Sequence, residues 1–348
     1  MRPGLAAALA LAVAGACCPH SWAGPPAAEQ RKKLAALRRE LSGKPAYSAE
    51  WFAAAEGMLQ LGEPGGKLLL ATLDARLPAL KRDYRGAFQL RAKRLAAARL
   101  AEAAKKPGMS RPKLETHVRK LRQAVLDLRS EDKLEKADIK KAADPAMAQL
   151  QALMWIDAKA VLDGAADLAG KRRTLLAVWK LRDRCTKPAG HDAETSLAAL
   201  EELCGLLAVP GAARFGRVLE YNARLEVQLK VEEAAGIRDL NRIRLLLGVG
   251  AVQIDLRLCR AARDHSTDMR TKDFFAHDSP VPGKETPWKR AKLAGTTASA
   301  ENIAGGAKTG PGANQQWFHS PGHFKNMLGG HRRVGLGHDG KWTQMFGR

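Results

Sequence analysis

Three short motifs in the last quarter of the chain contain residues that can bind metal ions or transfer protons. His277 is followed by Asp-Ser-Pro, Glu301 by Asn-Ile-Ala, and His323 is preceded by Ser-Pro-Gly. Imidazole and carboxylate groups carry out both kinds of chemistry near neutral pH. Because the three residues lie on separate segments, they form a site only if the fold brings the segments together.

Metal binding is one interpretation of these side chains. A zinc or other divalent ion held by His277 and His323, with Glu301 or water completing its shell, fits because two imidazoles leave coordination positions open. His319 and His323 have the spacing of a helical zinc pair, but the Ser-Pro-Gly between them interrupts a helix. Neither histidine has a neighbouring glutamate, so the zinc-protease motif is absent.

Structural roles are the other interpretation. A single histidine more often packs or caps than reacts, and His265, in the middle of an expected helix, is read in that way. Glu301 could equally be a hydrogen-bond acceptor that holds its loop together. Ser320 lies three residues before His323, but this short spacing does not establish that the two side chains touch.

The segments around these residues predict both helices and strands. From Gly236 onward the sequence becomes richer in Gly, His, Phe and Trp. Apolar residues three and four positions apart predict two helices; they are Ile237, Leu240, Ile243 and Leu247 in the first, and Leu256, Cys259, Ala262 and Met269 in the second. Alternating residues in 334–338 and 342–346 predict a hairpin. Its expected turn at Asp339-Gly340 is type I′, which needs positive φ at both central residues.

The preceding region, residues 24–230, predicts an all-helical structure because Ala, Leu, Lys and Arg dominate it. The clearest helix follows Ser110, and its apolar face is formed by Leu114, Val118, Leu121, Val125 and Leu128. Breaks are expected at 62–66, 106–108 and 187–190. No fixed repeat holds, so an array, a bundle and a long hairpin all remain open, and the expected role is structural or adhesive.

The N-terminus resembles an export signal, expected to cover residues 1–23. Arg2 precedes an apolar run from Leu5 to Ala16, and Ala23 closes a Ser-Trp-Ala cleavage pattern. A partial lipobox ending at Cys17 offers a lipoprotein as the alternative. Either interpretation predicts a secreted, periplasmic or cell-envelope protein.

The chain is strongly basic. Its 348 residues carry a net charge of +22, and both the part before Gly236 and the part from Gly236 onward are basic, without a polybasic run. This charge favours attraction to anionic surfaces, or it is simply a solvated basic exterior. Nucleic acid is an unlikely partner for an exported chain that has no nucleic-acid-binding motif.

Three cysteines remain outside the signal region: Cys185, Cys204 and Cys259. An odd number cannot all pair within one chain. A bridge between Cys185 and Cys204 is left open.

The order of motifs resembles the CAP superfamily, which contains the cysteine-rich secretory proteins, antigen 5 and plant pathogenesis-related proteins. It is most similar to the bacterial SCP-like extracellular branch, over residues 236–348, roughly a third of the chain. The matching motifs, in order, are Asn241-x-x-Arg244, Ala261 to Ser266, His277 to Pro280, Glu301 to Ala304, Trp317, Ser320 to His323, Asn326, Val334 to Gly337 and Trp342 to Gly347.

The resemblance implies an α+β chain, in which a three-layer α-β-α sandwich with a small antiparallel sheet follows the all-helical region. It also implies a cleft lined by two histidines, His277 and His323, and by Glu301. Animal and plant members have a second acidic residue where this chain has Ser320. One fewer carboxylate weakens the case for a tight divalent-cation site.

Two classes of function follow. The first is a binding or effector module for a lipid, glycan or protein partner outside the cell. The second is a hydrolase or metal-dependent enzyme, in which His277 or His323 acts as general base on water or on Ser320, steered by Glu301. The family resemblance implies no settled common reaction, so the binding module is favoured.

Overall fold

A computed structural model describes residues 27–186 and 192–348. The expected signal segment, the lipobox at Cys17 and the break at 187–190 therefore lie outside the described residues. The chain divides between Leu73 and Asp74 into two compact units, which are described separately.

The first unit is a small helical bundle. It contains α1 (Ala27–Gly43), α2 (Ala49–Gln60) and the beginning of α3 (Glu63–Ala104). Ser48 starts α2 because its side-chain oxygen accepts a hydrogen bond from the Trp51 amide. The Trp51 side chain is fully buried and makes edge-on ring contacts with Tyr47 and Phe52, so this tryptophan is a core residue of the unit.

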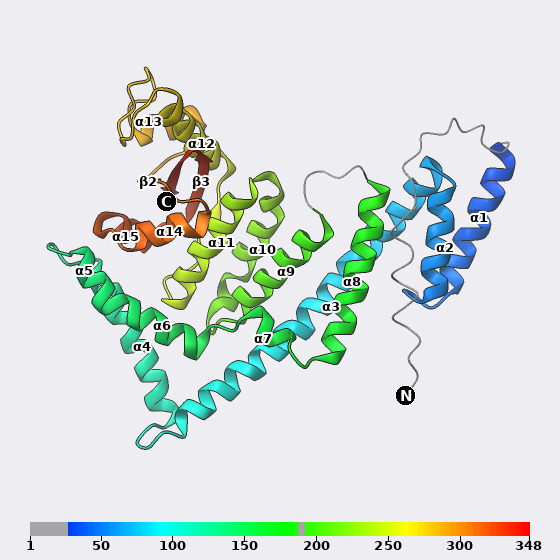
Figure 1. Ribbon diagram of the computed structural model, residues 1–348, viewed down its shortest axis with the longest axis horizontal. Coiled ribbons are helices and arrows are strands. Elements are labelled where there is room, and N and C mark those ends of the chain that lie inside the picture. The colour runs from blue at the N-terminus through cyan, green and yellow to red at the C-terminus, as the bar shows by residue number, and fades with distance from the viewer. Residues whose placement is uncertain (1–26, 187–191) are drawn as a thin grey trace. The chain divides into compact units, whose positions relative to one another are not determined.

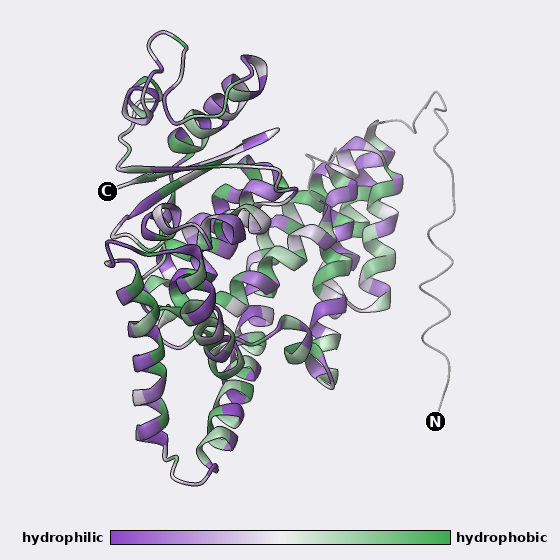
Figure 2. Cartoon of the chain, turned by 60° about the vertical axis from the view of Figure 1, so that its left-hand side comes forward, coloured by the Kyte–Doolittle hydropathy of each residue, from purple (hydrophilic) through white to green (hydrophobic). Residues whose placement is uncertain are grey.

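The second unit begins with helices. They are the remainder of α3, α4 (Arg111–Leu128), α5 (Lys136–Asp138), a π-helical turn (Ile139–Ala143), α6 (Asp144–Met154), α7 (Ala158–Leu162), α8 (Ala166–Cys185), α9 (Ala193–Ala208), a 3-10 turn (Ala212–Phe215), α10 (Gly216–Leu225), a second 3-10 turn (Glu226–Gln228) and α11 (Val231–Leu246). The face predicted for 111–128 is the buried face of α4, with Leu121 only partly covered. Figure 2 shows hydrophobic and hydrophilic residues on different sides of several of these helices.

The C-terminal part of this unit has three layers. It contains β1 (Gln253–Ile254), α12 (Leu256–Thr271), α13 (Pro287–Leu293), β2 (Ala300–Gly305), α14 (Gly310–Phe318), α15 (Pro321–Met327), β3 (Arg333–Asp339) and β4 (Lys341–Gly347). Helices α12 and α13 lie on one side of the sheet, and α11 and α14 lie on the other (Figure 1). The α+β prediction is confirmed.

The sheet differs in one respect from the expectation of an antiparallel sheet. Its strand order is β1-β3-β4-β2, and β1 runs parallel to β3 while the other two pairs are antiparallel. Only two residues of β1 pair, which is too short a segment for an alternating pattern to be recognised. The sheet is therefore mixed.

Close packing between β3 and α12 depends on glycine. A Cβ atom on Gly335 would overlap the backbone at Leu258 and Cys259, and one on Gly337 would overlap the backbone of Arg263. Leu336, between the two glycines, points to the opposite face and packs near α11. The Gly-Leu-Gly sequence therefore sets how closely a helix can approach the sheet.

The hairpin is present, but its turn is not type I′. Asp339 pairs with Lys341, so Gly340 alone forms the tip, and only Gly340 of the Asp-Gly step has positive φ (71°). Asp339 remains in β3, where its carboxylate accepts hydrogen bonds from Thr267 Oγ1 at 2.8 Å and from Arg270 at 2.8–2.9 Å. These bonds to α12 account for the extended conformation of Asp339.

Two residues from the helical region complete the sheet layer. Asn222 of α10 donates to the carbonyl of Val252 and accepts from the amide of Ile254, at 3.0 and 2.8 Å. Glu233, in the first turn of α11, is fully buried, pairs with Arg263 of α12 and accepts from the amide of His338 at 3.0 Å. Gly236, where the composition changes, lies inside α11.

The described cysteines are free, so the Cys185–Cys204 bridge is not formed. Burial raises the pKa of the Cys204 and Cys259 thiols to about 12, which makes both poor nucleophiles. Within the described residues, no helix combines the length and apolar character that a membrane crossing needs.

Candidate functional site

The structure brings His277, Glu301 and His323 together from three different elements. His277 lies in the loop between α12 and α13, Glu301 on β2, and His323 on α15. His277 Nδ1 lies 2.9 Å from Glu301 Oε1, and the ring centroids of His277 and His323 are 6.5 Å apart. The site is therefore built around one carboxylate and two neighbouring imidazoles.

Strand alternation explains why Glu301 and Asn302 occur next to each other. Successive residues of a strand point to opposite faces. The Glu301 side chain turns toward α12 and α13 and is only 2% exposed. The Asn302 side chain turns toward the other layer, where it donates to Gln344 Oε1 at 3.0 Å and accepts from Asn326 at 2.9 Å. The first residue belongs to the site, and the second fixes the position of β2 above α15.

Arg290 of α13 is a site residue that the sequence did not indicate. Its side chain is fully buried, and Nη2 lies 2.9 and 2.8 Å from the two oxygens of Glu301. The same guanidinium donates to the carbonyls of His277 and Lys284. No signal in the sequence singles it out, because residues 289, 290 and 292 are all basic and only the fold decides which one is buried.

His265 of α12 lies beneath the same carboxylate. The side chain is fully buried, and Nε2 donates to the carbonyl of Ala276 at 3.1 Å and lies 4.0 Å from Glu301 Oε1. Its Nδ1 atom has no hydrogen-bond partner among the described residues. Burial lowers the pKa of His265, so its imidazole is neutral at pH 7. It packs against Phe274, as expected of a structural histidine.

His323 and Ser320 occupy the other side of the site. Burial, followed by the nearby His277, lowers the pKa of His323, which favours the neutral imidazole at pH 7. Ser320 stands at the N-cap position of α15 without a side-chain capping bond. No hydrogen bond joins its hydroxyl to either site histidine within the described residues.

The remaining C-terminal histidines lie elsewhere. His319 Nε2 contacts Asp144 at the start of α6, at 2.9 and 3.0 Å, and so does not join His323. His331 stacks on Phe346 and accepts from or donates to Ser299, and His338 stacks on Trp342. These three histidines serve packing and the attachment of neighbouring helices.

Comparison with known proteins identifies this part of the chain. Residues 237–345 match the family model described as CAP, the cysteine-rich secretory protein family. The C-terminal region is a CAP domain. The resemblance seen in the motif order is thereby confirmed.

Similar proteins match about a third of this chain. An uncharacterised protein of Bacillus subtilis (strain 168), YkwD, is 38% identical over 112 residues, which cover 30% of this chain and 43% of YkwD. An uncharacterised membrane protein of the same organism, YlbC, is 32% identical over 108 residues, covering 30% and 31%. The chain thus spans less than half the length of these relatives.

A solved structure is similar over about a third of the chain. It is an extracellular protein containing an SCP domain from Bacillus anthracis str. Ames, with 30% identity and a TM-score of 0.32, covering 34% of this chain and 40% of that one.

The CAP site, formed by His277, Glu301 and His323, suits a metal ion poorly if Glu301 is to be one of the ligands. Both of its oxygens are occupied by Arg290, and a guanidinium at this distance repels a second cation. No group of three His, Cys, Asp or Glu side chains in the described part of the chain is arranged to hold a metal ion. A site made by His277 and His323 with water remains a prediction.

The arrangement of the CAP site controls the orientation of His277. Because a carboxylate only accepts hydrogen bonds, the Nδ1 proton of His277 is directed to Glu301, and Nε2 is the atom left for a ligand. The His277 side chain is 48% exposed. The site therefore presents an oriented imidazole to solvent, next to a second, less exposed one.

Proposed function

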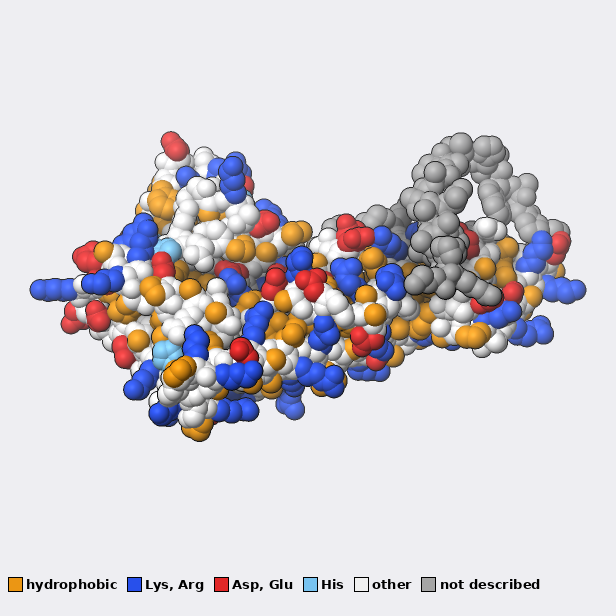
Figure 3. All heavy atoms as spheres, turned by 60° about the horizontal axis from the view of Figure 1, so that its bottom comes forward, with side chains coloured by type: hydrophobic (Ala, Val, Ile, Leu, Met, Phe, Trp, Pro, Cys, Tyr) orange, Lys and Arg blue, Asp and Glu red, His pale blue; other side chains and the backbone are white. Residues whose placement is uncertain are grey.

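We propose that the CAP domain is the binding or effector module of an exported protein, and that it recognises an extracellular or cell-envelope ligand, whether lipid, glycan or protein, through His277, Glu301 and His323. The export signal expected at residues 1–23 supports the location. The basic surface supports attraction to an anionic envelope; Figure 3 shows Lys and Arg side chains scattered over the face in view, interspersed with acidic and apolar ones.

The pairing of Glu301 is the observation that carries this proposal. A general base needs an accessible lone pair, whereas the Glu301 carboxylate is buried and receives hydrogen bonds from Arg290 and His277. Its negative charge is compensated by a guanidinium that is itself buried. Glu301 is thus suited to holding His277 in place with Nε2 toward a ligand, and it is not placed to act as a general base itself.

A hydrolase is the alternative, and one observation favours it. The pKa of His323 is lowered by burial and by His277, so this imidazole is neutral at pH 7 and can accept a proton. Ser320, the residue on which it would act, makes no hydrogen bond to it in the described residues. The two functions predict different effects of removing His323 on ligand binding and on turnover.

The test compares the full chain with His323→Ala and His277→Ala. The probes are vesicles with and without anionic phospholipid, purified peptidoglycan, and a glycan array, and hydrolysis of ester and peptide substrates is measured in parallel. His117→Ala is the matched control, since His117 lies on α4 and contacts Gln149 outside the site. The binding module predicts that retention on one probe falls in both site variants and not in the control, without turnover by the wild type. Turnover that His323→Ala abolishes while binding is preserved would establish the hydrolase instead.

Metal analysis tests the remaining interpretation, which is a metal site at the two histidines. A metal ion held by His277 and His323 requires a stoichiometric metal in the purified chain that is lost in His277→Ala. If both proteins contain none after growth with zinc and copper supplied, the two-histidine metal site is rejected and the binding module stands.

A further inference from the structure

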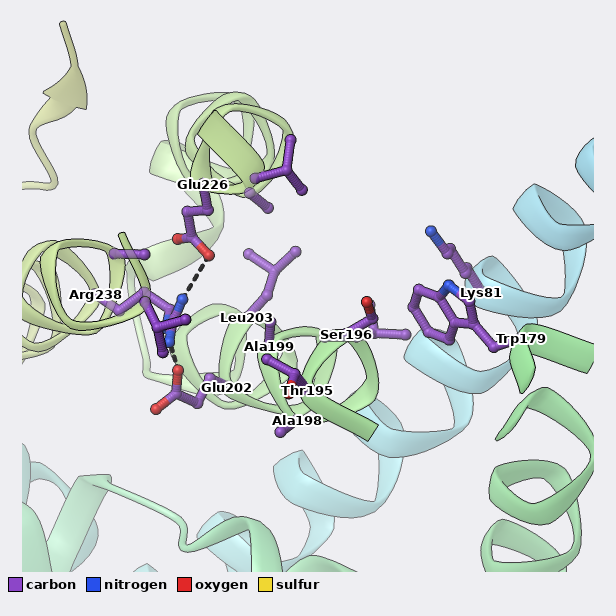
Figure 4. Close-up of a pocket in the computed structure, with 15 residues that line it drawn as sticks. Lys81, Trp179, Thr195, Ser196, Ala198, Ala199, Glu202, Leu203, Glu226 and Arg238 are labelled. Carbon is purple, nitrogen blue, oxygen red and sulfur yellow. Dashed lines mark hydrogen bonds and ion pairs between the residues drawn. The ribbon is translucent and has the colours of Figure 1, made fainter. Parts of the chain in front are cut away.

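A second candidate ligand site lies in the helical part of the second unit, away from the CAP histidines. It is a pocket with a volume of about 290 Å³, lined by residues of α3, α8, α9, α10 and α11 and of the 3-10 turn at 226–228 (Figure 4). This volume is near the lower end of the roughly 300–1,000 Å³ that small-molecule sites occupy. None of the sequence motifs points to it.

The middle of the pocket is apolar. Its lining includes Ala198, Ala199, Leu200, Leu203 and Ala223, together with two valines at the rim. Those two, Val227 and Val231, are 64% and 50% exposed, so both present apolar surface to solvent. Covering such surface with hydrocarbon is favourable, by about 25 cal/mol for each Å² removed from water.

One end of the pocket holds a cation to which the described residues offer no anionic partner. Lys81 Nζ lies 4.3 Å from the centre of the Trp179 ring. No carboxylate among the described residues forms a salt bridge with it. Asp74, which attracts it from farther away, is itself bonded to Arg182 at 2.7 Å, and the charge of Arg182 also acts on Lys81. Burial lowers the pKa of Lys81, which is the response of a cation that lacks a close anion.

The opposite end carries the opposite charge. Arg238 is flanked there by two carboxylates, those of Glu202 and Glu226, so this trio has a net charge of −1 when all three groups are ionised (Figure 4). An anion is therefore repelled from this end and attracted to Lys81. The pocket selects the direction in which an elongated ligand enters.

We propose that this pocket binds an alkyl monocarboxylate, with its carboxylate on Lys81 Nζ and its hydrocarbon chain along Leu200, Leu203 and the valines of the rim. A single lysine matches a single negative charge, and the apolar centre matches a chain without polar groups. A neutral alkyl compound leaves Lys81 unpaired, and a cationic one is repelled by it.

The experiment measures binding of dodecanoate, below its micelle concentration, to the full chain by calorimetry at pH 7.5. Dodecan-1-ol and dodecyltrimethylammonium are the neutral and cationic comparisons. We expect one dodecanoate per chain, bound about tenfold or more tightly than either comparison, which is the effect of one charge-assisted hydrogen bond in a partly buried site.

Two variants place the ligand in the pocket. Lys81→Gln is expected to weaken dodecanoate by about tenfold and to leave dodecan-1-ol unchanged. Lys93→Gln, on the same helix but exposed and outside the pocket, is the matched control and should have no effect. Ala199→Phe fills the apolar centre and should abolish binding of both compounds, with circular dichroism reporting whether the variant is folded.

Equal affinity for dodecanoate and dodecan-1-ol, or equal effects of Lys81→Gln and Lys93→Gln, would overturn the proposal. If Ala199→Phe does not fold, a dodecanoate analogue with a diazirine on its chain replaces it. Labelling of peptides that contain residues lining the pocket supports the site, and labelling confined to other peptides rejects it.

Discussion

The CAP site and the helical pocket differ in whether a charged side chain has a partner of opposite charge. In the CAP site, Glu301 is surrounded by Arg290 and His277, and its charge is compensated within the fold. In the helical pocket, Lys81 has an aromatic ring beside it and forms no salt bridge with a carboxylate of the described residues. A compensated charge positions other groups, whereas an uncompensated one favours an incoming ligand of opposite sign. The CAP domain, whose sequence is rich in motifs, thus contains a preorganised site. The helical region, whose sequence has no such motifs, contains the lysine without a salt-bridge partner.

The largest expected effect tests the compensated charge. Arg290→Met leaves the Glu301 carboxylate buried without its cation, and removing one partner of such a pair typically costs about 3–5 kcal/mol. We expect this loss in the free energy of unfolding, measured by urea denaturation at pH 7.5.

The double variant Arg290→Met with Glu301→Gln removes both charges and should recover part of the loss. If Arg290→Met alone unfolds no more easily than wild type, Glu301 is not held by Arg290 and the contrast with Lys81 disappears.

A smaller effect is expected where the CAP sheet meets α12. Gly337→Ala would place a methyl group against the backbone of Arg263, and overpacking of this kind costs about 1–3 kcal/mol. Gly330→Ala is the control in the same domain, because no atom lies within 4 Å of the place its methyl group would take and its φ is not positive. Similar midpoints of thermal unfolding for the two variants would contradict the tight helix–sheet contact.

The helical region should respond to the same substitution with the opposite sign. Gly86 lies in the middle of α3, is exposed, and has open space at its Cβ position. Gly86→Ala should stabilise the protein by about 0.5–1 kcal/mol, since alanine has the higher helix propensity. A loss of stability in urea denaturation would show that α3 is not a regular helix at this point.

Replacing His331 is expected to have the smallest effect on stability at neutral pH and a larger effect in acid. Burial, followed by the charges of Arg244 and Arg348, lowers the pKa of His331 to about 4, below its unfolded value of about 6.5. The unfolded chain therefore takes up a proton first, and the stability contributed by neutral His331 is present above pH 6.5 and is lost as the pH falls from about 6.5 to about 4.

His331→Gln cannot titrate, so its melting temperature should fall less than that of the wild type over this range. The cost of the substitution itself is read at pH 7.5 and subtracted. An identical acid profile in both proteins would place the acid sensitivity outside His331.

The sequence predicted those features that repeat or alternate. The apolar periods of α4 and α12 and the alternation in β3 and β4 follow from local geometry. Arg290 was missed because three basic residues on α13 look alike until the fold buries one of them. The Lys81 pocket was missed because its lining comes from several helices with no fixed spacing. The prediction of a type I′ turn at the hairpin tip was wrong because contacts from α12 to Asp339 outweighed the turn preference of Asp-Gly.

The side chains that α10 and α11 give to the sheet layer have a consequence for how this protein can be divided. The stretch that matches the family begins at residue 237, but the amide of Ile254 is satisfied by Asn222, and the guanidinium of Arg263 is paired with the buried Glu233. A fragment cut at that border would lose both partners and expose the face of α11 that packs against α6 and α9. The stretch that matches the family is therefore shorter than the unit that folds, and any excised CAP domain of this protein should start before α10.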